Sequence, residues 1–398
     1  MKHLQTLGIL VFAVCLTQIA SDIYAPSLPC ITRSFQTTVQ YAQWTMALYM
    51  LSVALSQLVY GPLSERFGRK PPIIFGLIVM FIGSFTCFLS NNIEMLFTGR
   101  VIQGVGAGAC AALWRTIFRD HFQGNDLSRY GSYLMILVMF IVPAAPFLGG
   151  ILQDHFGWRS TFAFMVIYAS LTIVLFSLYF KETLPMDKRT NLNLQKIGKT
   201  YLHLLKSPDF MCGSVCVFLC YGAFFTWFTV GPILMIEKAG LTPTQFGWFT
   251  FLGCGIAYAT AGLINARLVK KYGSIAMLKL GWLIMLIASL SLYFSYPIWG
   301  VNAFAIGIPI ILFYFGSTFI WPNTYAMAFT PYGSIAGYVG ALYGFMQLAG
   351  AGCLAYFVSY LKSYDQQSIA ITMASSVILA IFTFNYYTAS KKRKHAMI

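Results

Sequence analysis

Two ionisable side chains lie inside long apolar stretches of this sequence, and their types suit them to proton chemistry. Asp22 lies in the apolar run 4–24, whereas the other ten acidic residues lie in loops or at expected helix ends. Arg100 lies in a second apolar run, residues 95–113. A carboxyl group that gains and loses a proton can couple proton movement to another process, and an arginine keeps its charge beside it. We therefore expect Asp22 and Arg100 to be proton-coupling residues.

Each of these residues also has a simpler interpretation. An ionised carboxylate inside a membrane costs a few kcal/mol, so Asp22 should be paired or protonated unless it lies close enough to the interface to be solvated. Arg100 must pair or face water, unless it extends toward the outer interface as a snorkelling side chain. No histidine relay competes with Asp22, because all five histidines lie in loops or tails: His3, His121, His155, His203 and His395.

The elements that position these residues are expected to be membrane-spanning helices. The mean hydropathy is +0.70, and 58% hydrophobic against 9% charged residues excludes an ordinary soluble protein. Continuous apolar runs of about 20 residues fit helices that cross a bilayer, whereas barrel strands alternate in hydropathy. Twelve spans are expected, at residues 4–24, 41–60, 72–90, 95–113, 129–151, 160–180, 209–231, 245–266, 274–294, 300–322, 336–358 and 368–388.

The net charge of +15 is distributed as in a membrane protein and does not indicate nucleic-acid binding. With a cytoplasmic amino terminus, the outer loops hold only Arg33, Arg159, Lys238 and Lys362. Apart from Arg100, all remaining Lys and Arg residues fall on the inner side, which predicts that both termini are cytoplasmic. The basic run 391–394 is expected to anchor the last span to anionic lipid.

The polar segment 181–208 divides the chain into two halves. We expect a six-helix bundle at residues 1–184, a partly helical cytoplasmic connector at 185–208, and a second bundle with a basic tail at 209–398. The first apolar run is longer than a signal-peptide core, so no cleavable signal is expected. Nine cysteines do not indicate a disulfide framework, and no His or carboxylate completes a metal site in the run 209–231 that holds Cys212, Cys216 and Cys220.

A short charged segment, residues 61–70, joins the second and third expected spans. Its sequence is Gly61-Pro62-Leu63-Ser64-Glu65-Arg66-Phe67-Gly68-Arg69-Lys70. Residues 266–273 occupy the same place in the second half and share its basic character and its aromatic-glycine ending. Any short cytoplasmic loop is basic, but the shared ending and the equal number of spans favour a repeat of two pseudo-symmetric halves.

This segment resembles the signature loop between helices 2 and 3 of the major facilitator superfamily, Gly-x-Leu-x-Asp-Arg-x-Gly-Arg-Lys. Glu65 stands where the family usually has aspartate. The resemblance implies an all-α major facilitator fold of twelve helices, with the loop acid meeting the amino terminus of helix 11. That helix follows the uncharged residues 331–334, so Glu65 would meet backbone N–H groups. The implied conformational gating residues here are Gly61, Glu65, Arg66, Gly68 and Arg69.

Three further segments carry the resemblance. Residues 99–108 resemble the helix 4 motif Arg-x-x-Gln-Gly-x-Gly, which is associated with proton transfer and contains Arg100. Residues 143–150 resemble the antiporter motif Gly-Pro-x-x-Gly-Gly of drug-efflux members, and residues 21–29 resemble the Asp-x-Tyr-x-Pro-x-x-Pro of the bicyclomycin/chloramphenicol-resistance branch of drug:proton antiporters. The antiporter motif adds three gating residues, Pro146, Gly149 and Gly150.

The resemblance also implies a substrate cavity lined mainly by helices 1, 4, 7 and 10. Aromatic and neutral polar residues in or near those helices are the expected substrate contacts: Gln18, Tyr49, Gln103, Phe224, Trp227, Tyr314, Trp321 and Gln347. An aromatic, nearly uncharged cavity suits lipophilic or cationic compounds through cation–π contact. Aromatic residues make up 17% of the chain, so packing alone also accounts for many of them.

Together these features predict a proton-coupled exporter of small organic molecules, a multidrug efflux antiporter, in the inner membrane of a bacterium. The expected partners are a small-molecule substrate, protons and membrane lipids, with a monomeric chain and no cofactor, metal or nucleic acid. The closest alternative is a proton-coupled importer of a nutrient such as an amino acid. A receptor or scaffold with a degenerate transporter fold is a further alternative. An enzyme is disfavoured, because the helices contain no nucleophile–base pair, metal cluster or cofactor motif.

Overall fold

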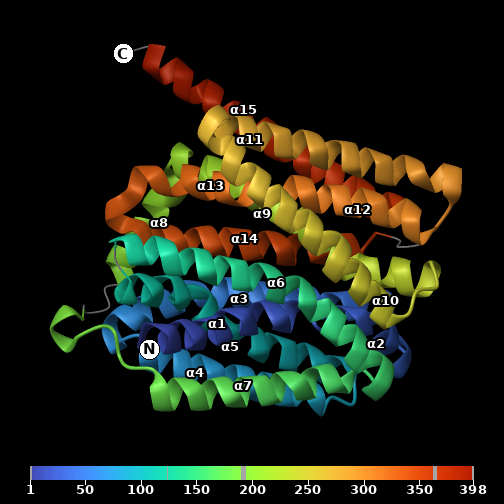
Figure 1. Cartoon of the computed structure of the whole chain (residues 1–398), viewed down its shortest axis with the longest axis horizontal. Helices are drawn as coiled ribbons and strands as arrows, with labels where there is room; N and C mark the ends of the chain where they lie inside the picture. The colour runs from blue at the N-terminus through green and yellow to red at the C-terminus, as the bar shows by residue number, and fades with distance from the viewer. Residues whose placement is uncertain (1, 123, 190–193, 362–364, 397–398) are drawn as a thin grey trace. The chain divides into compact units, whose positions relative to one another are not determined.

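The computed structural model describes residues 2–122, 124–189, 194–361 and 365–396, and within these ranges its regular elements are helices without strands (Figure 1). The chain forms two compact units. Unit 1 comprises Met1–Leu194 together with Leu241–Leu252, and unit 2 comprises Gln195–Gly240 together with Gly253–Ile398. All nine cysteines lie in the described residues and are free thiols.

Unit 1 carries the residues of both expected proton-coupling positions and of the charged segment. Its helices are α1 (Lys2–Asp22), α2 (Leu28–Ser34), α3 (Val39–Phe67), α4 (Lys70–Phe88), α5 (Ile93–His121), α6 (Gly124–Phe156), α7 (Arg159–Tyr179) and α10 (Pro243–Trp248), with a 3-10 turn at Ala25–Ser27. Polar caps fix several of these starts: the Asn92 side chain accepts a hydrogen bond from the Met95 amide at 2.7 Å.

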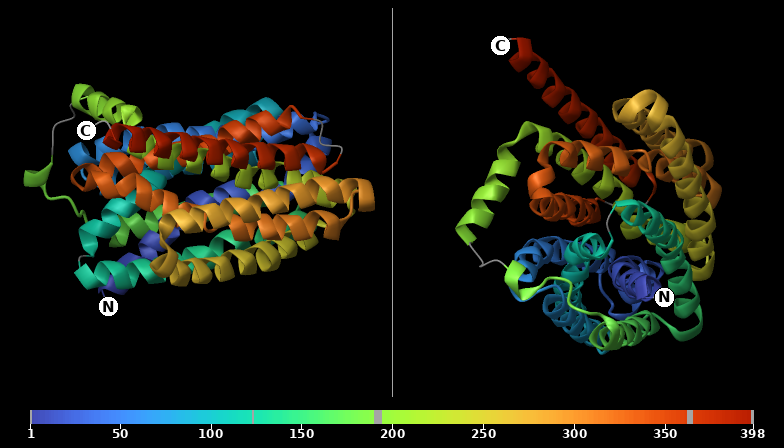
Figure 2. Two further views of the ribbon diagram at one scale, coloured as in Figure 1. Left: turned by 90° about the horizontal axis from the view of Figure 1, so that it is seen from above. Right: turned by 60° about the vertical axis from the view of Figure 1, so that its left-hand side comes forward.

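Unit 2 contains the second set of long helices, and Figure 2 shows them from two further directions. They are α8 (Leu194–Lys206, all but its first residue), α9 (Pro208–Pro232), α11 (Gly255–Trp299), α12 (Ala303–Ser317), α13 (Ile320–Phe329), α14 (Ala336–Ser359) and α15 (Gln367–Ala396). Short π-helical segments follow α9 at Ile233–Lys238 and α10 at Phe249–Cys254, and a 3-10 segment lies at Thr330–Ile335. A further 3-10 segment, Met186–Lys188, belongs to unit 1.

Ten segments of the described residues are long and apolar enough to cross a membrane. One of them, Pro243–Trp299, contains two of the twelve expected spans, and the chain bends inside it at Gly273, where φ is 79°. The expected span 129–151 lies in α6, where many side chains fall outside the described residues. The expected span 300–322 is divided, because α12 ends at Ser317 and α13 begins at Ile320. The expected spans are thus found as helices of sufficient length and apolar composition, with element ends that differ from the expected ones.

Glycines allow the helices of unit 1 to pack closely around α5. A Cβ on Gly83 of α4 would overlap the backbone of Gln103, and one on Gly104 would lie 2.6 Å from the carbonyl oxygen of Tyr49 in α3. Close backbone approach of this kind is how membrane helices associate without a hydrophobic driving force. It brings α3 and α4 against the part of α5 that carries Arg100.

Candidate functional site

Asp22 lies at the end of α1, and its side chain is almost completely buried, with 3% of its surface exposed. The Ser21 hydroxyl lies 2.5 Å from Asp22 Oδ1 and 2.7 Å from the carbonyl oxygen of Gln18. When Asp22 is ionised, Ser21 donates to it; when Asp22 is protonated, it can donate to Ser21, whose own proton then turns to Gln18. The local geometry therefore accommodates both protonation states of Asp22.

Arg100 is fully buried inside a polar and aromatic cage in unit 1. Its Nε donates to the carbonyl oxygen of Thr45 at 3.3 Å, and its Nη1 donates to the carbonyl oxygen of Ala20 at 3.0 Å. Its Cζ lies 4.5 Å from the ring centroid of Tyr24 and 4.1 Å from that of Tyr49. The two rings hold the cation by cation–π contact in a site that water does not reach.

Arg100 and Asp22, the two expected proton-coupling residues, do not form an ion pair with each other. In the described part of the chain no ion pair joins the two side chains, and Arg100 Nη2 is buried without a hydrogen-bond partner. The physical reason is that two backbone carbonyl oxygens and the Gln103 amide oxygen already accept hydrogen bonds from the guanidinium. Arg100 is therefore a buried positive charge that is held to α1 through Ala20, two residues before Asp22.

Gln103 and Tyr49 form part of this cage. Gln103 Oε1 accepts from Arg100 Nη1 at 2.5 Å, and Gln103 Nε2 donates to the hydroxyl of Ser84 at 2.9 Å. The Tyr49 hydroxyl donates to the carbonyl oxygen of Thr17 at 2.8 Å. Both side chains are fully buried. The structure thus places these two expected substrate contacts against Arg100, and it places the half-buried Gln18 one turn before Asp22 on α1.

The charged segment 61–70 is mostly helical, which corrects its interpretation as a loop. α3 continues through Phe67 and α4 begins at Lys70, so only Gly68 and Arg69 lie between them. Gly68 has a φ of 92°, a left-handed conformation that favours glycine. Hydropathy shows where a segment is apolar enough to lie in the membrane, but it does not show where the helix ends. The polar continuation of α3 beyond its apolar run therefore could not be predicted from hydropathy.

Arg69 organises the polar groups at this end of unit 1, and only 4% of its surface is exposed. Its Nη1 donates to the Ser64 hydroxyl at 2.7 Å and to Glu65 Oε1 at 2.9 Å, and its Nε donates to Asp120 Oδ2 at 3.1 Å. Arg69 therefore ties the end of α3 to the end of α5. Arg66 is exposed, and its guanidinium lies 5.1 Å from the ring centroid of Phe67.

Glu182, which the sequence did not single out, joins the same network. Its carboxylate accepts from the Arg69 and Lys70 amides at 2.8 and 3.1 Å, and from the Thr183 and Leu184 amides at 2.9 Å each. Partial burial acts to raise the pKa of the Glu182 carboxyl, but these four backbone donors outweigh it and lower the pKa. A Cβ on Gly68 would overlap the Glu182 carboxylate. Glu182 thus caps the start of α4 and packs against Gly68, whose positive φ favours glycine at that position.

The antiporter-like segment of α6 packs against backbone on two sides within unit 1. A Cβ on Gly149 would overlap the carbonyl oxygen of Ile23, just after α1, and one on Gly150 would overlap that of Pro243 in α10. Pro146 is buried nearby. One turn after Gly150, Asp154 Oδ2 accepts from the Thr244 amide at 2.9 Å and also contacts the Thr244 hydroxyl. The two glycines therefore allow α6 to contact α1 and α10 directly.

The comparison with known families fits this arrangement. Residues 10–353 match the protein-family model described as Major Facilitator Superfamily. The chain belongs to the Major Facilitator Superfamily. It is thus a multi-pass membrane protein of a transporter family, and the predicted family and fold are confirmed.

Several relatives resemble this transporter along most of its length. It is 26% identical to multidrug resistance protein D of Escherichia coli K12, over 96% of this chain and 95% of the relative. It is also 26% identical to a bicyclomycin resistance protein homolog of Haemophilus influenzae, with the same coverage. It is 27% identical to a chloramphenicol resistance protein of Pseudomonas aeruginosa, over 67% of this chain and 62% of the relative.

The fold is shared with solved sugar transporters. The xylose transporter XylE of E. coli, in a partially occluded inward-open conformation, matches with a TM-score of 0.74 and 14% identity over 96% of this chain and 97% of that chain. A D-xylose-proton symporter matches with a TM-score of 0.72 and 15% identity over 96% of this chain and 98% of that chain. At this level of identity the likeness concerns the fold alone.

The remaining expected substrate contacts of this transporter lie in unit 2. The structure brings three of them together: the ring centroid of Phe224 lies 4.2 Å from that of Tyr314 and 5.7 Å from that of Trp321. Trp227 is fully buried in α9 beside Gly231, and Gln347 is half buried in α14. The aromatic cluster therefore spans α9, α12 and α13.

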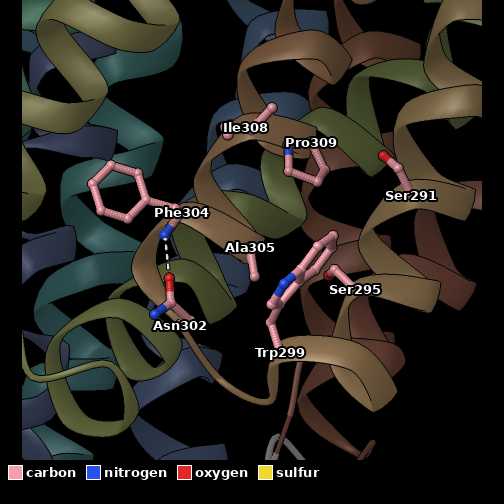
Figure 3. Close-up of a pocket in the computed structure, with 8 residues that line it drawn as sticks. All are labelled: Ser291, Ser295, Trp299, Asn302, Phe304, Ala305, Ile308 and Pro309. Atoms are coloured by element: carbon pink, nitrogen blue, oxygen red, sulfur yellow. Dashed lines mark hydrogen bonds between the residues drawn. The ribbon is translucent and has the colours of Figure 1, made fainter.

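A groove of about 450 Å³ lies elsewhere in unit 2, between the end of α11 and the start of α12 (Figure 3). Trp299, Phe304 and Ile308 give it an apolar lining, with Ser291, Ser295 and Asn302 as polar groups. None of the eight expected substrate contacts lines it. Within the described residues no three His, Cys, Asp or Glu side chains gather as metal ligands.

Proposed function

We propose that this transporter exports small lipophilic or cationic organic compounds in exchange for protons, as a multidrug efflux protein of a bacterial inner membrane. The observation that carries the proposal is the buried Asp22 carboxyl beside the caged Arg100 in the membrane-spanning part of unit 1. The printed names of the drug-resistance relatives support the export of such compounds. Its partners are then protons, a small organic substrate and membrane lipids.

Asp22 is the proton carrier in this proposal. A proton that binds Asp22 needs only a rotation of the Ser21 hydroxyl toward the Gln18 carbonyl, 2.7 Å away, to keep every hydrogen bond. When the site faces the opposite side, Asp22 releases the proton and the Ser21 hydroxyl again donates to its carboxylate. Substrate and proton then compete for one site, which is the minimal requirement for exchange.

Conformational gating falls to two clusters of unit 1. Arg69 with Glu65 and Asp120 holds the ends of α3 and α5 together at one end of the unit. Gly149 and Gly150 allow the contacts of α6 with its neighbours. We assign three further gating positions expected from the sequence, Gly61, Arg66 and Gly68, to the first cluster. We assign Pro146 to the second cluster.

The remaining assignments complete the proposal. The aromatic residues Phe224, Tyr314 and Trp321 contact the substrate, together with the other positions expected from the sequence. The chain acts as a monomer without enzymatic activity or nucleic-acid binding, and both termini are cytoplasmic. Residues 1–184 and 209–398 are the two pseudo-symmetric bundles, joined by the connector 185–208.

Proton flux in proteoliposomes tests the proposal. Adding a lipophilic cation or a neutral antibiotic to proteoliposomes with an acidic lumen should release protons in the native protein and not in Asp22→Asn. Asp187→Asn, which removes an exposed acid of the connector, serves as the matched control and should retain the flux. Flux that persists in Asp22→Asn contradicts the role of Asp22. Proton-driven accumulation of a nutrient without any drug response would favour the importer.

A further inference from the structure

Helix α8 (Leu194–Lys206) carries an exposed face that the transport mechanism does not use. Leu202 and Leu205 are 51% and 42% exposed, although both are apolar. Lys199, His203 and Lys206 are exposed as well. At the helical spacing of about 100° per residue these five side chains share one face, with the leucines on one flank and the basic groups on the other.

The opposite face of α8 attaches the helix to unit 2. Leu204 is fully buried, and the ring centroid of Tyr201 lies 5.8 Å from that of Tyr338 in α14. Just after the helix, the Ser207 hydroxyl contacts the hydroxyl of Tyr332. α8 is therefore held in a fixed rotation, with its basic and apolar face directed outward. Figure 2 shows it in yellow-green at the edge of unit 2 in the right-hand view.

The position and charge of α8 identify its partner. The membrane-crossing segment Pro208–Lys238 begins two residues after α8 ends, so the carboxyl end of α8 lies at the membrane surface. From Lys188 to Pro208 the sequence contains five Lys or Arg residues and no acid. A helix with exposed leucines beside lysines matches an interface in which the leucines enter the acyl region and the lysines meet anionic headgroups.

We propose that the exposed face of α8 is an anionic-lipid binding surface that docks the connector on the membrane. Leu202 and Leu205 insert below the headgroups, while Lys199 and Lys206 bind the phosphates of lipids such as phosphatidylglycerol. An acidic cytosolic protein would satisfy the lysines, but it would not require two exposed leucines next to a membrane-crossing helix. The membrane is therefore the partner that can contact both the exposed leucines and the basic side chains of α8.

Amide hydrogen exchange of the full-length protein in nanodiscs tests this surface. The α8 amides should exchange more slowly in discs that contain phosphatidylglycerol than in discs of phosphatidylcholine alone, and added salt should reduce the difference. Each lysine near an anionic surface contributes roughly a factor of five to binding, so the double variant Lys199→Gln/Lys206→Gln should weaken docking by about thirtyfold. Leu202→Ser/Leu205→Ser should also abolish the slow exchange.

A matched variant separates this site from a general charge effect. Lys270→Gln/Lys271→Gln removes two exposed lysines from a different segment of unit 2 and should leave α8 exchange unchanged. Unaltered exchange of the α9 amides shows in each variant that the fold is intact. Equal α8 exchange in both lipid compositions overturns the proposal, as does slow exchange that persists in the lysine double variant. Slow exchange that appears only after cytosolic proteins are added assigns the surface to a protein partner instead.

Discussion

Arg100 occupies a site that discriminates arginine from lysine. Its guanidinium donates to Thr45, Ala20 and Gln103 while it lies between the rings of Tyr24 and Tyr49. A lysine ammonium has no planar fork and cannot make this set of contacts. We therefore expect Arg100→Lys to lower the free energy of unfolding by about 2 kcal/mol and to reduce drug-evoked proton flux. Thermal unfolding of the detergent-solubilised protein measures the first effect.

A second substitution controls for the general effect of replacing arginine. Arg267 is exposed in the segment that leads to Gly273, and Arg267→Lys should leave the unfolding temperature unchanged. If Arg100→Lys is as stable as the native protein, the cage does not hold the guanidinium as the geometry indicates.

Glu182 is expected to make stability depend on pH. Its folded-state pKa lies below the ordinary value of 4.5. Such a group stabilises the fold at pH values above its unfolded pKa, and this contribution is lost as the pH falls through the folded pKa. Glu182→Gln should thus lower the unfolding free energy at neutral pH by less than about 1 kcal/mol, because the side chain is exposed and solvent screens its charge, and the two proteins should converge in acid.

Unfolding measured from neutral pH to below pH 4 tests this expectation, with Asp187→Asn, which removes an exposed carboxyl five residues further along the chain, as the control. A difference between native protein and Glu182→Gln that stays constant down to the acid limit would show that the cap does not depend on the carboxylate charge.

The residues that sequence could identify are those that are rare in their surroundings. Asp22 and Arg100 stand out because ionisable groups are uncommon in apolar runs. Glu182 lies in the polar segment 181–208, where an acid is ordinary, and its partner amide at Lys70 is 112 residues away. Asp120 likewise meets Arg69 across 51 residues. Such pairs arise from tertiary packing, for which a single sequence carries no signal.

At the scale of helices, the glycine contact between α4 and α5 supports the site. A Cβ on Gly83 would overlap the backbone of Gln103, whose side chain accepts from Arg100. We expect Gly83→Ala to separate the two helices, to lower the unfolding free energy by about 1–3 kcal/mol and to reduce transport with it. Gly8→Ala is the matched control, because a Cβ there meets nothing within 4 Å. It should be neutral or stabilising, since alanine is the better helix former.

The elements were predictable in character, as long apolar helices, but not in their ends. Continuous apolar runs identified the spans because the bilayer demands them. The helical continuation through residues 61–67 and the break between α12 and α13 were missed. Both depend on polar or backbone contacts at helix ends, which do not alter hydropathy.

At the scale of the whole molecule, one short segment packs in a different unit from the one that its position in the sequence suggests. Leu241–Leu252 follows the connector in sequence, yet it groups with unit 1. Its contacts explain this: Asp154 accepts from the Thr244 amide, and the ring centroids of Phe147 and Trp248 lie 4.2 Å apart. Counting spans places the segment in the second half, because contacts of side chains with distant backbone are invisible to such a count.

The proposed exchange predicts how the membrane potential acts on the whole transporter. If Asp22 carries one proton per cycle, export of a neutral compound moves one net charge, whereas export of a monovalent cation moves none. The potential contributes about 2.3 kcal/mol per charge per 100 mV, which is roughly fiftyfold in the accumulation ratio. Clamping the potential to zero with potassium and valinomycin, at a constant pH gradient, should therefore reduce the accumulation ratio of a neutral drug and spare that of a monocation. A monocation ratio that also falls would require a second proton per cycle, and hence a second carrier besides Asp22.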